Sequence, residues 1–148
     1  MKNYLTGLRK ETATKFILIA DDDEDDRFLM SDFFSKNAFK CMTLPSGTAA
    51  IHVLQLLSPT LYPALIFLDY YMPTINGEQV LMFLKKSEKL KHIPVIMYST
   101  EMTDALKHRL QSLGASKCFS KAIQLDQLNN MKDEVDLILS STRFVQTN

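Results

Sequence analysis

The chain has little cysteine, no net charge and no long apolar run, and each of these shortages excludes a class of protein. Two widely spaced cysteines, Cys41 and Cys118, make neither a disulfide framework nor a zinc site. Lys plus Arg and Asp plus Glu both number 17, which gives no support for broad electrostatic binding to nucleic acid or to an anionic membrane. No apolar run approaches the roughly 20 residues that cross a bilayer. We therefore expect a cytoplasmic protein with reduced thiols, without direct nucleic-acid or membrane contact.

The two ends of the chain differ from its middle. Residues 1–14 are polar and aperiodic and lack the apolar core of a signal peptide, so we expect a flexible N-terminal extension. Residues 15–140 are expected to form one domain, because 46% of the 148 residues are hydrophobic and a chain of this length can bury a substantial core. Residues 141–148 are expected to be a frayed C-terminal tail.

The segment Leu65–Asp69 is the strongest structural signal, because four apolar residues run directly into an aspartate. A run without alternation is typical of a strand buried on both faces of a parallel sheet. Strands are expected at residues 16–20, 39–44, 64–68, 95–98 and 116–120. Apolar residues at helical spacing lie between them and predict helices within residues 27–37, 50–57, 80–86, 102–113 and 125–138. This alternation predicts an α/β fold in which helices cover both faces of a parallel sheet.

Polar side chains follow four of these strands, at the point where each strand ends. Asp21–Asp23 follow the first, Asp69 the third, Ser99 the fourth and Lys121 the fifth. The carboxyl ends of parallel strands share one edge of the sheet, so these groups meet in one pocket if the strands are neighbours. Three carboxylates at such short range require a cation, and hard oxygen ligands suit Mg²⁺. Together with a hydroxyl and an ammonium they form a site for a phosphoryl group, with Asp69 as nucleophile.

These residues resemble the receiver domains of two-component response regulators, in the single-domain, chemotaxis-like arrangement. The resemblance covers roughly residues 15–140, and its four short motifs are specific because they occur together in the right order. They are ILIADDDEDDR at 17–27, LIFLDYYMPTINGEQVL at 65–81, PVIMYST at 94–100 and GASKCFSKA at 114–122. The resemblance implies a (βα)5 doubly wound, five-stranded parallel sheet with the flavodoxin-like strand order 2-1-3-4-5.

The resemblance also implies which residues hold the metal and the phosphoryl group. Asp69 is similar to the aspartate that a histidine kinase phosphorylates. Asp22 matches the direct Mg²⁺ ligand, and Asp21 matches its partner, which acts mostly through water. The backbone carbonyl of Tyr71 is implied as a further metal ligand. The expected cofactor is therefore Mg²⁺.

Two further positions match the family and two depart from it. Ser99 matches the switch hydroxyl that moves to the phosphoryl group, and Lys121 matches the lysine that pairs with Asp69 or its phosphate. The family usually has proline after this lysine, where this chain has Ala122, which puts the pose of Lys121 in doubt. The aromatic switch position of the family is Cys118 here, so the usual coupling between hydroxyl and aromatic ring is expected to be altered.

The leading functional hypothesis is a signalling switch of a two-component phosphorelay, which is not a turnover enzyme. It is expected to catalyse only its own phosphoryl transfer and a slow autodephosphorylation. The autodephosphorylation is expected to be slow because the bulk of Thr100 and Tyr71 restricts the access of water to the phosphate. The partners implied are a sensor histidine kinase or a histidine phosphotransfer protein. Since no effector domain follows in this sequence, a downstream protein is expected to bind the face made by the last two helices, 102–113 and 125–138, and the strand between them.

Two alternatives remain. A phosphatase of the haloacid dehalogenase type also begins with a strand followed by Asp-x-Asp, here Asp21 and Asp23. It needs a further acidic pair at a strand end after the lysine, and the acids that follow Lys121 are Asp126 and the helical pair 133–134. The other alternative is a pseudo-receiver, a binding module that keeps the fold and is not phosphorylated.

Overall fold

The computed structural model describes residues 15–121 and 124–146, and within them strands and helices alternate. The expected extension, residues 1–14, and Ala122 lie outside the described residues. The elements are, in order, β1 (Phe16–Ala20), α2 (Glu24–Lys36), β2 (Lys40–Leu44), α3 (Gly47–Leu56), the 3-10 helix η1 (Pro59–Leu61), β3 (Leu65–Asp69), α4 (Gly77–Lys86), β4 (Val95–Ser99), α5 (Asp104–Ser112), β5 (Lys117–Ser120) and α6 (Leu125–Gln146).

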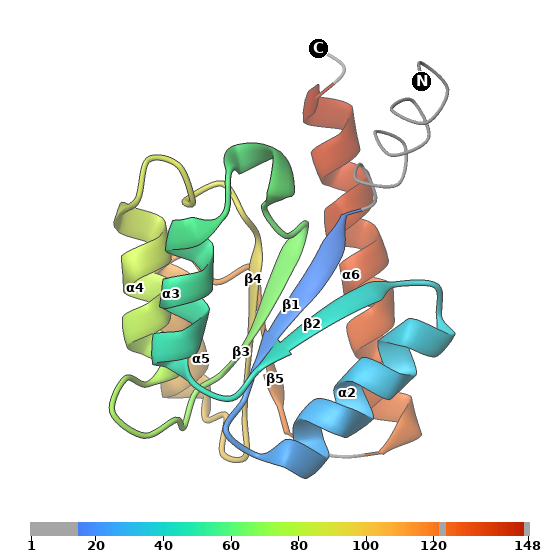
Figure 1. Cartoon of the computed structure of the whole chain (residues 1–148). Coiled ribbons are helices and arrows are strands. Elements are labelled where there is room, and N and C mark those ends of the chain that lie inside the picture. Colours follow the sequence, from blue (N-terminus) through green and yellow to red (C-terminus); the bar gives the residue numbers. More distant parts are fainter. Residues whose placement is uncertain (1–14, 122–123, 147–148) are drawn as a thin grey trace.

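The five strands form one parallel sheet in the order β2-β1-β3-β4-β5, which confirms the predicted fold. Figure 1 shows α3, α4 and α5 on one face of the sheet and α2 and α6 on the other. The carboxyl ends of the strands lie at the lower edge of this view, where α2 begins. Both faces are therefore covered, as right-handed crossovers between parallel strands require.

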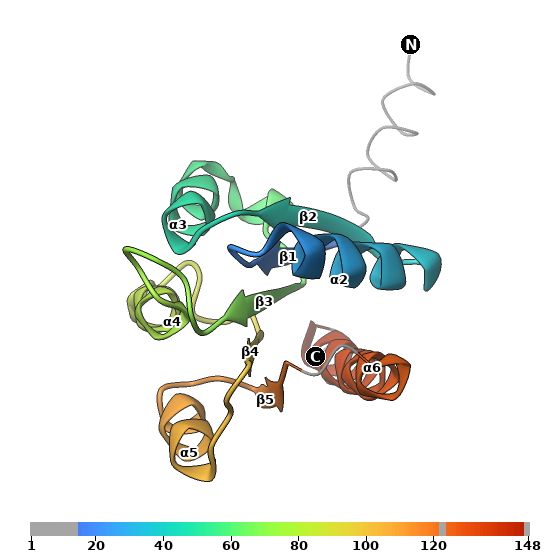
Figure 2. The same ribbon diagram turned by 90° about the horizontal axis from the view of Figure 1, so that it is seen from below.

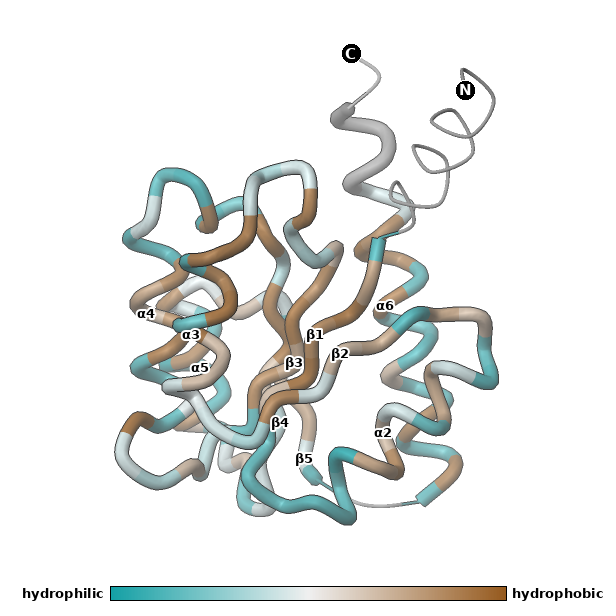
Figure 3. The backbone as a smooth tube through the Cα atoms, in the orientation of Figure 1, coloured by the Kyte–Doolittle hydropathy of each residue, from teal (hydrophilic) through white to brown (hydrophobic). Residues whose placement is uncertain are grey.

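Burial follows the position of each strand in the sheet. All five residues of the central strand β3 are buried, whereas β2 at the edge is mostly exposed or half-buried. Figure 3 shows the contrast along the chain, with hydrophobic strands in brown and a hydrophilic segment in teal between β1 and α2. The apolar run at residues 65–68 thus marks the middle of the sheet, as its lack of alternation predicts.

Strand alternation divides the apolar side chains into two cores. The core under α3, α4 and α5 contains, among others, Leu18, Leu54, Ile66, Leu81, Met97 and Leu110. The core under α2 and α6 contains, among others, Ile19, Phe34, Phe67, Tyr98, Met131 and Val135. Successive residues of one strand point to opposite faces, so neighbouring positions such as Met97 and Tyr98 belong to different cores.

The helix ends use common capping chemistry. The Asp23 side chain accepts a hydrogen bond from the Asp26 N–H and is the N-cap of α2. The helix begins at Glu24, before the expected residue 27, because three acids of the run form its first turn near the positive end of the dipole. Gly114 has φ 112° directly after the C-cap of α5, as is typical of a C′ glycine.

The C-terminal helix is longer than the sequence analysis predicts. Helix α6 continues to Gln146, so residues 141–146, assigned above to a frayed tail, are helical. No helix within residues 15–121 and 124–146 combines the length and apolar character needed to span a bilayer.

Candidate functional site

The carboxyl edge of the sheet brings together acidic and basic side chains that are far apart in the sequence. Asp21 directly follows β1, Asp69 ends β3 and Lys121 directly follows β5. Asp69 is paired in register with Tyr98, and Tyr98 belongs to the core under α2 and α6. Figure 2 views the molecule from this edge and shows β1, β3, β4 and β5 side by side. The condition for the predicted pocket, that these strands are neighbours, is met.

Three carboxylates meet at this edge. Asp21 is fully buried and Asp69 is 3% exposed, whereas Asp22 is exposed. One oxygen of each lies within 4.8 Å of the others, so they form an oxygen-only donor set. Such a set suits a hard divalent cation such as Mg²⁺ or Mn²⁺, and the exposed side of Asp22 leaves room for metal-bound water. The residues present therefore fit the predicted metal, although their individual roles stay predictions.

Lys121 is the cation at the centre of this acidic group. Its Nζ lies 3.1 Å from Asp69 Oδ2 and 3.0 Å from Asp21 Oδ2. Its shortest ion pair, 2.7 Å, is to Asp26 Oδ2 on the first turn of α2. The side chain is 12% exposed and its backbone N–H donates to the Ser99 carbonyl oxygen. Lys121 thus contacts Asp69 directly in this structure.

The structure adds two side chains that the sequence analysis did not assign to the site. Asp26 pairs with Lys121, and the Tyr98 hydroxyl donates a 2.8 Å hydrogen bond to Asp21 Oδ2. The Tyr98 ring also lies under Lys121, with Nζ 5.3 Å from the ring centroid. Strand alternation is the signal that points to Tyr98, because a residue in register with Asp69 faces the same side of the sheet.

The surplus of acid changes the electrostatics of the site. Burial, with the neighbouring charge of Asp21 and a hydrogen bond to it, raises the pKa of Asp69 to about 7 despite the opposing charge of Lys121. Burial lowers the pKa of Lys121, but the surrounding carboxylates outweigh burial and raise this pKa overall. Burial and the Asp21 charge raise the pKa of Tyr98 well above its usual value, so its hydroxyl remains a donor.

Ser99 is not in hydrogen-bond contact with the carboxylates. It is fully buried, and its hydroxyl contacts the backbone N–H and carbonyl of Glu101 at 3.3 and 3.4 Å. Ser99 follows Tyr98 in β4, so strand alternation turns its side chain away from the face that Asp69 shares with Tyr98.

The other two predicted positions lie near the site in different environments. The Tyr71 N–H donates to Asp69 Oδ1 at 3.3 Å, while the Tyr71 side chain is 54% exposed and meets the Tyr70 ring edge to face. Cys118 is buried in the core under α3, α4 and α5, where the family has its aromatic switch residue. The predicted metal role of the Tyr71 carbonyl stays a prediction.

Gly77 holds the segment after Asp69 close to the sheet. Its N–H donates to the Tyr70 carbonyl oxygen at 2.9 Å, and a Cβ at this position would collide with the carbonyl oxygen of Asp69. Only glycine permits this approach, which starts α4 directly beside the end of β3. Asn76 completes the turn as the N-cap of α4, in a capping box with Gln79.

Comparisons with known proteins agree with this arrangement. Residues 17–133 match the response regulator receiver domain family. The two-component response regulator ORR5 of Oryza sativa is 29% identical over 119 residues, which cover 80% of this chain and 87% of ORR5. The two-component response regulator ARR8 of Arabidopsis thaliana is 30% identical over 138 residues, with 82% of this chain and 61% of ARR8 covered.

Solved structures share the fold. The Mn²⁺-bound form of response regulator Rcp1 has a TM-score of 0.69 and 27% identity, with 79% of this chain and 88% of that chain covered. The chemotaxis protein CheY4 of Vibrio cholerae has a TM-score of 0.73 and 21% identity, with 83% and 99% covered. The family match spans most of the chain, and the fold has the strand order expected of it. This chain therefore belongs to the response regulator receiver domains, the signalling domains of two-component systems.

Proposed function

We propose that the chain is a phosphoacceptor switch of a two-component phosphorelay, with Asp69 as the residue that takes the phosphoryl group. The observation that carries the proposal is the position of Asp69, buried at the end of β3, 3.1 Å from Lys121 and grouped with two further carboxylates. The donor is a phosphohistidine, either of a sensor histidine kinase or of a histidine phosphotransfer protein. The domain is then a signalling protein that reacts once per signal.

The transfer is an in-line displacement at phosphorus. An oxygen of the ionised Asp69 carboxylate attacks, a P–O bond forms, and the P–N bond to the donor histidine breaks. The histidine leaves with the electron pair of the broken bond and retains a proton on its ring. Lys121 keeps the Asp69 carboxylate oriented through its 3.1 Å contact and balances negative charge on the transferred group.

The residues proposed to hold Mg²⁺ are Asp21, Asp22, Asp69 and the backbone carbonyl of Tyr71. Bound there, Mg²⁺ supplies positive charge against the oxygens of the phosphoryl group. Burial first, and then the charge of Asp21, raise the pKa of Asp69 to about 7, and both effects oppose the ionised carboxylate. A cation bound beside Asp69 would favour the ionised form, which is the nucleophile.

The proposed output follows from where Ser99 and Lys121 stand in the chain. Ser99 begins the segment that leads to α5, and Lys121 begins the segment that leads to α6. Movement of the Ser99 hydroxyl from Glu101 to the phosphoryl group shifts the first of these segments. A downstream protein that binds across α5, β5 and α6 can sense this shift.

A slow autodephosphorylation belongs to the same proposal. Tyr71, two residues after Asp69, has a half-exposed side chain at the site, and Thr100 is an exposed residue after Ser99. Their bulk restricts the approach of water to the acyl phosphate. We expect Tyr71→Ala to shorten the lifetime of the phosphorylated protein, and a wild-type lifetime of only seconds would contradict this part.

The test is the intact mass after incubation with acetyl phosphate and Mg²⁺. We expect a gain of one phosphoryl group in the wild-type protein, and no gain in Asp69→Asn or when EDTA replaces Mg²⁺. A protein that folds, binds Mg²⁺ and is never phosphorylated by this donor or by a phosphohistidine protein would instead be a pseudo-receiver. Sustained phosphate release that Asp69→Asn leaves unchanged would favour the phosphatase alternative, with Asp21 as nucleophile.

A further inference from the structure

Tyr98 is a large side chain that is fully buried and carries a hydroxyl into the core under α2 and α6. A buried hydroxyl costs free energy unless it has a hydrogen-bond partner, so tyrosine at such a position needs a reason. Its partner is the Asp21 carboxylate at 2.8 Å, and Asp21 is itself fully buried. The pair thus joins β4, one residue before its carboxyl end, to the residue that follows β1 inside the protein.

We propose that Tyr98 is a positioning residue that fixes the Asp21 carboxylate for the Mg²⁺ site of the receiver. The inference rests on the proposed function in one respect, the assignment of Asp21 to the metal. It goes beyond that assignment, because it gives a role to a β4 residue that touches neither the phosphoryl group nor the metal. Three features support this role of Tyr98: the contacts of Asp21, the rigidity of Tyr98 and the position of Lys121.

The Asp21 carboxylate receives donors on both oxygens. Oδ1 accepts from the Asp23 N–H at 2.9 Å and from Lys121 at 3.2 Å. Oδ2 accepts from Tyr98 at 2.8 Å and lies 3.0 Å from Lys121 Nζ. Tyr98 therefore holds the oxygen that otherwise depends on Lys121 alone.

Lys121 cannot be the permanent support of Asp21. Its single ammonium is shared among Asp21, Asp26 and Asp69, and in the proposed reaction it also balances the phosphoryl group. When Lys121 binds the phosphoryl group, its contacts with Asp21 become weaker. Tyr98 stays, because its backbone is in the sheet and its ring meets Phe67 edge to face at 6.2 Å.

The ring and the hydroxyl of Tyr98 have separable roles. The ring lies under Lys121 at 5.3 Å, a distance at which an aromatic face attracts an ammonium. Tyr98→Phe keeps this ring and its packing and removes only the donor to Asp21. Hydrogen bonds from outer residues orient metal ligands, and their loss typically lowers metal affinity by about 10- to 100-fold.

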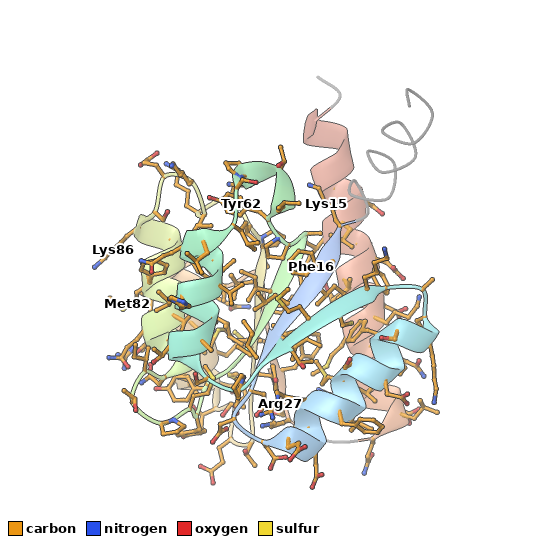
Figure 4. The ribbon with its side chains drawn as sticks, in the orientation of Figure 1. Lys15, Phe16, Arg27, Tyr62, Met82 and Lys86 are labelled. Atoms are coloured by element: carbon orange, nitrogen blue, oxygen red, sulfur yellow. The ribbon has the colours of Figure 1, made fainter. Side chains whose placement is uncertain are left out.

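The experiment compares Mg²⁺ dissociation constants, measured by calorimetry, for the wild type, Tyr98→Phe and Tyr62→Phe. Tyr62 is a matched control, since it is also buried but lies at the opposite end of the sheet, as Figure 4 shows relative to Arg27. We expect about tenfold weaker Mg²⁺ binding in Tyr98→Phe and no change in Tyr62→Phe.

A double-mutant cycle shows whether Tyr98 acts through Asp21. In the Asp21→Asn background we expect Tyr98→Phe to change Mg²⁺ affinity less than twofold. Equal Mg²⁺ affinity of the wild type and Tyr98→Phe would overturn the inference, as would a full tenfold effect in the Asp21→Asn background. A third outcome is that Tyr98→Phe weakens Mg²⁺ binding but the wild-type protein is never phosphorylated. This result would uphold the inference and reject the proposed function.

Discussion

Two clusters of charged side chains lie on opposite faces of the sheet, and they differ in charge balance. On the α3, α4 and α5 face, Glu78 is 7% exposed and meets Arg109 through two contacts of 2.7 and 2.9 Å. One acid faces one base, and the pair joins α4 to α5. On the α2 and α6 face, a single Lys121 serves three carboxylates.

This difference in charge balance distinguishes a structural ion pair from a site that can bind a cation. The Glu78–Arg109 pair is neutral, because one acid faces one base, so charge balance there requires no further ion. The Lys121 cluster keeps excess negative charge, and burial together with the charge of Asp21 raises the pKa of Asp69. A site of this kind is destabilised until a cation enters, which couples folding to metal binding.

The largest expected effect is on the pH dependence of stability without metal. The pKa of Asp69 is about 7 in the folded protein, whereas a solvent-exposed aspartate in the unfolded chain has its ordinary pKa of 3.8. Between these pH values the folded state therefore holds a proton that the unfolded state has lost. The free energy of unfolding in EDTA should therefore fall as the pH rises from 4 to 7, by up to roughly 4 kcal/mol.

Urea titrations in EDTA across this pH range measure the effect, with Asp69→Asn as the control. The variant has no titrating group at this position, so its free energy of unfolding should decrease much less between pH 4 and 7. Mg²⁺ should reverse the trend, because the ionised carboxylate is the form that binds it. An equal slope in the wild type and in Asp69→Asn would contradict the electrostatic difference between the two clusters.

The next effect comes from removing the cation of each cluster. Lys121→Ala leaves buried carboxylates without a partner and should destabilise the metal-free protein at pH 8 by about 3 kcal/mol. Arg109→Ala is the matched change in the balanced cluster and should cost about 1 kcal/mol, since the Arg109 side chain is 65% exposed. Unfolding in urea with and without Mg²⁺ measures both. Mg²⁺ should restore the stability of Lys121→Ala and leave that of Arg109→Ala unchanged. Equal restoration of both variants would show that the two clusters do not differ in charge balance.

The smallest effect uses one chemical change at both places. Asp69→Asn removes a charge from the crowded cluster and should stabilise the metal-free protein at pH 8 by about 2 kcal/mol. Glu78→Gln weakens a complete ion pair and should destabilise it by about 1 kcal/mol. Thermal unfolding in EDTA gives both values. Changes of the same sign would show that the two clusters are electrostatically alike.

Much of the site was predictable because it depends on where strands end. Asp21 and Asp69 come at the end of buried apolar runs, and Lys121 follows the short strand β5. Parallel strands bring such ends to one edge. Asp26 was not predictable in this way. It looked like one acid among six in the run 21–26, and its contact with Lys121 depends on how α2 lies across the sheet.

The sequence by itself determined the alternating elements, the parallel sheet and the acids at its carboxyl edge, because apolar periodicity and strand ends are local properties. Only the tertiary structure decided that the Tyr98 hydroxyl donates to Asp21, that the Ser99 hydroxyl contacts the Glu101 backbone and that Lys121 is shared among three carboxylates. Those contacts join residues up to 100 positions apart, and their lengths depend on sheet register and helix placement. The local sequence pattern determines which side chains lie at the carboxyl edge of the sheet. The packing of strands and helices determines which of these side chains contact one another.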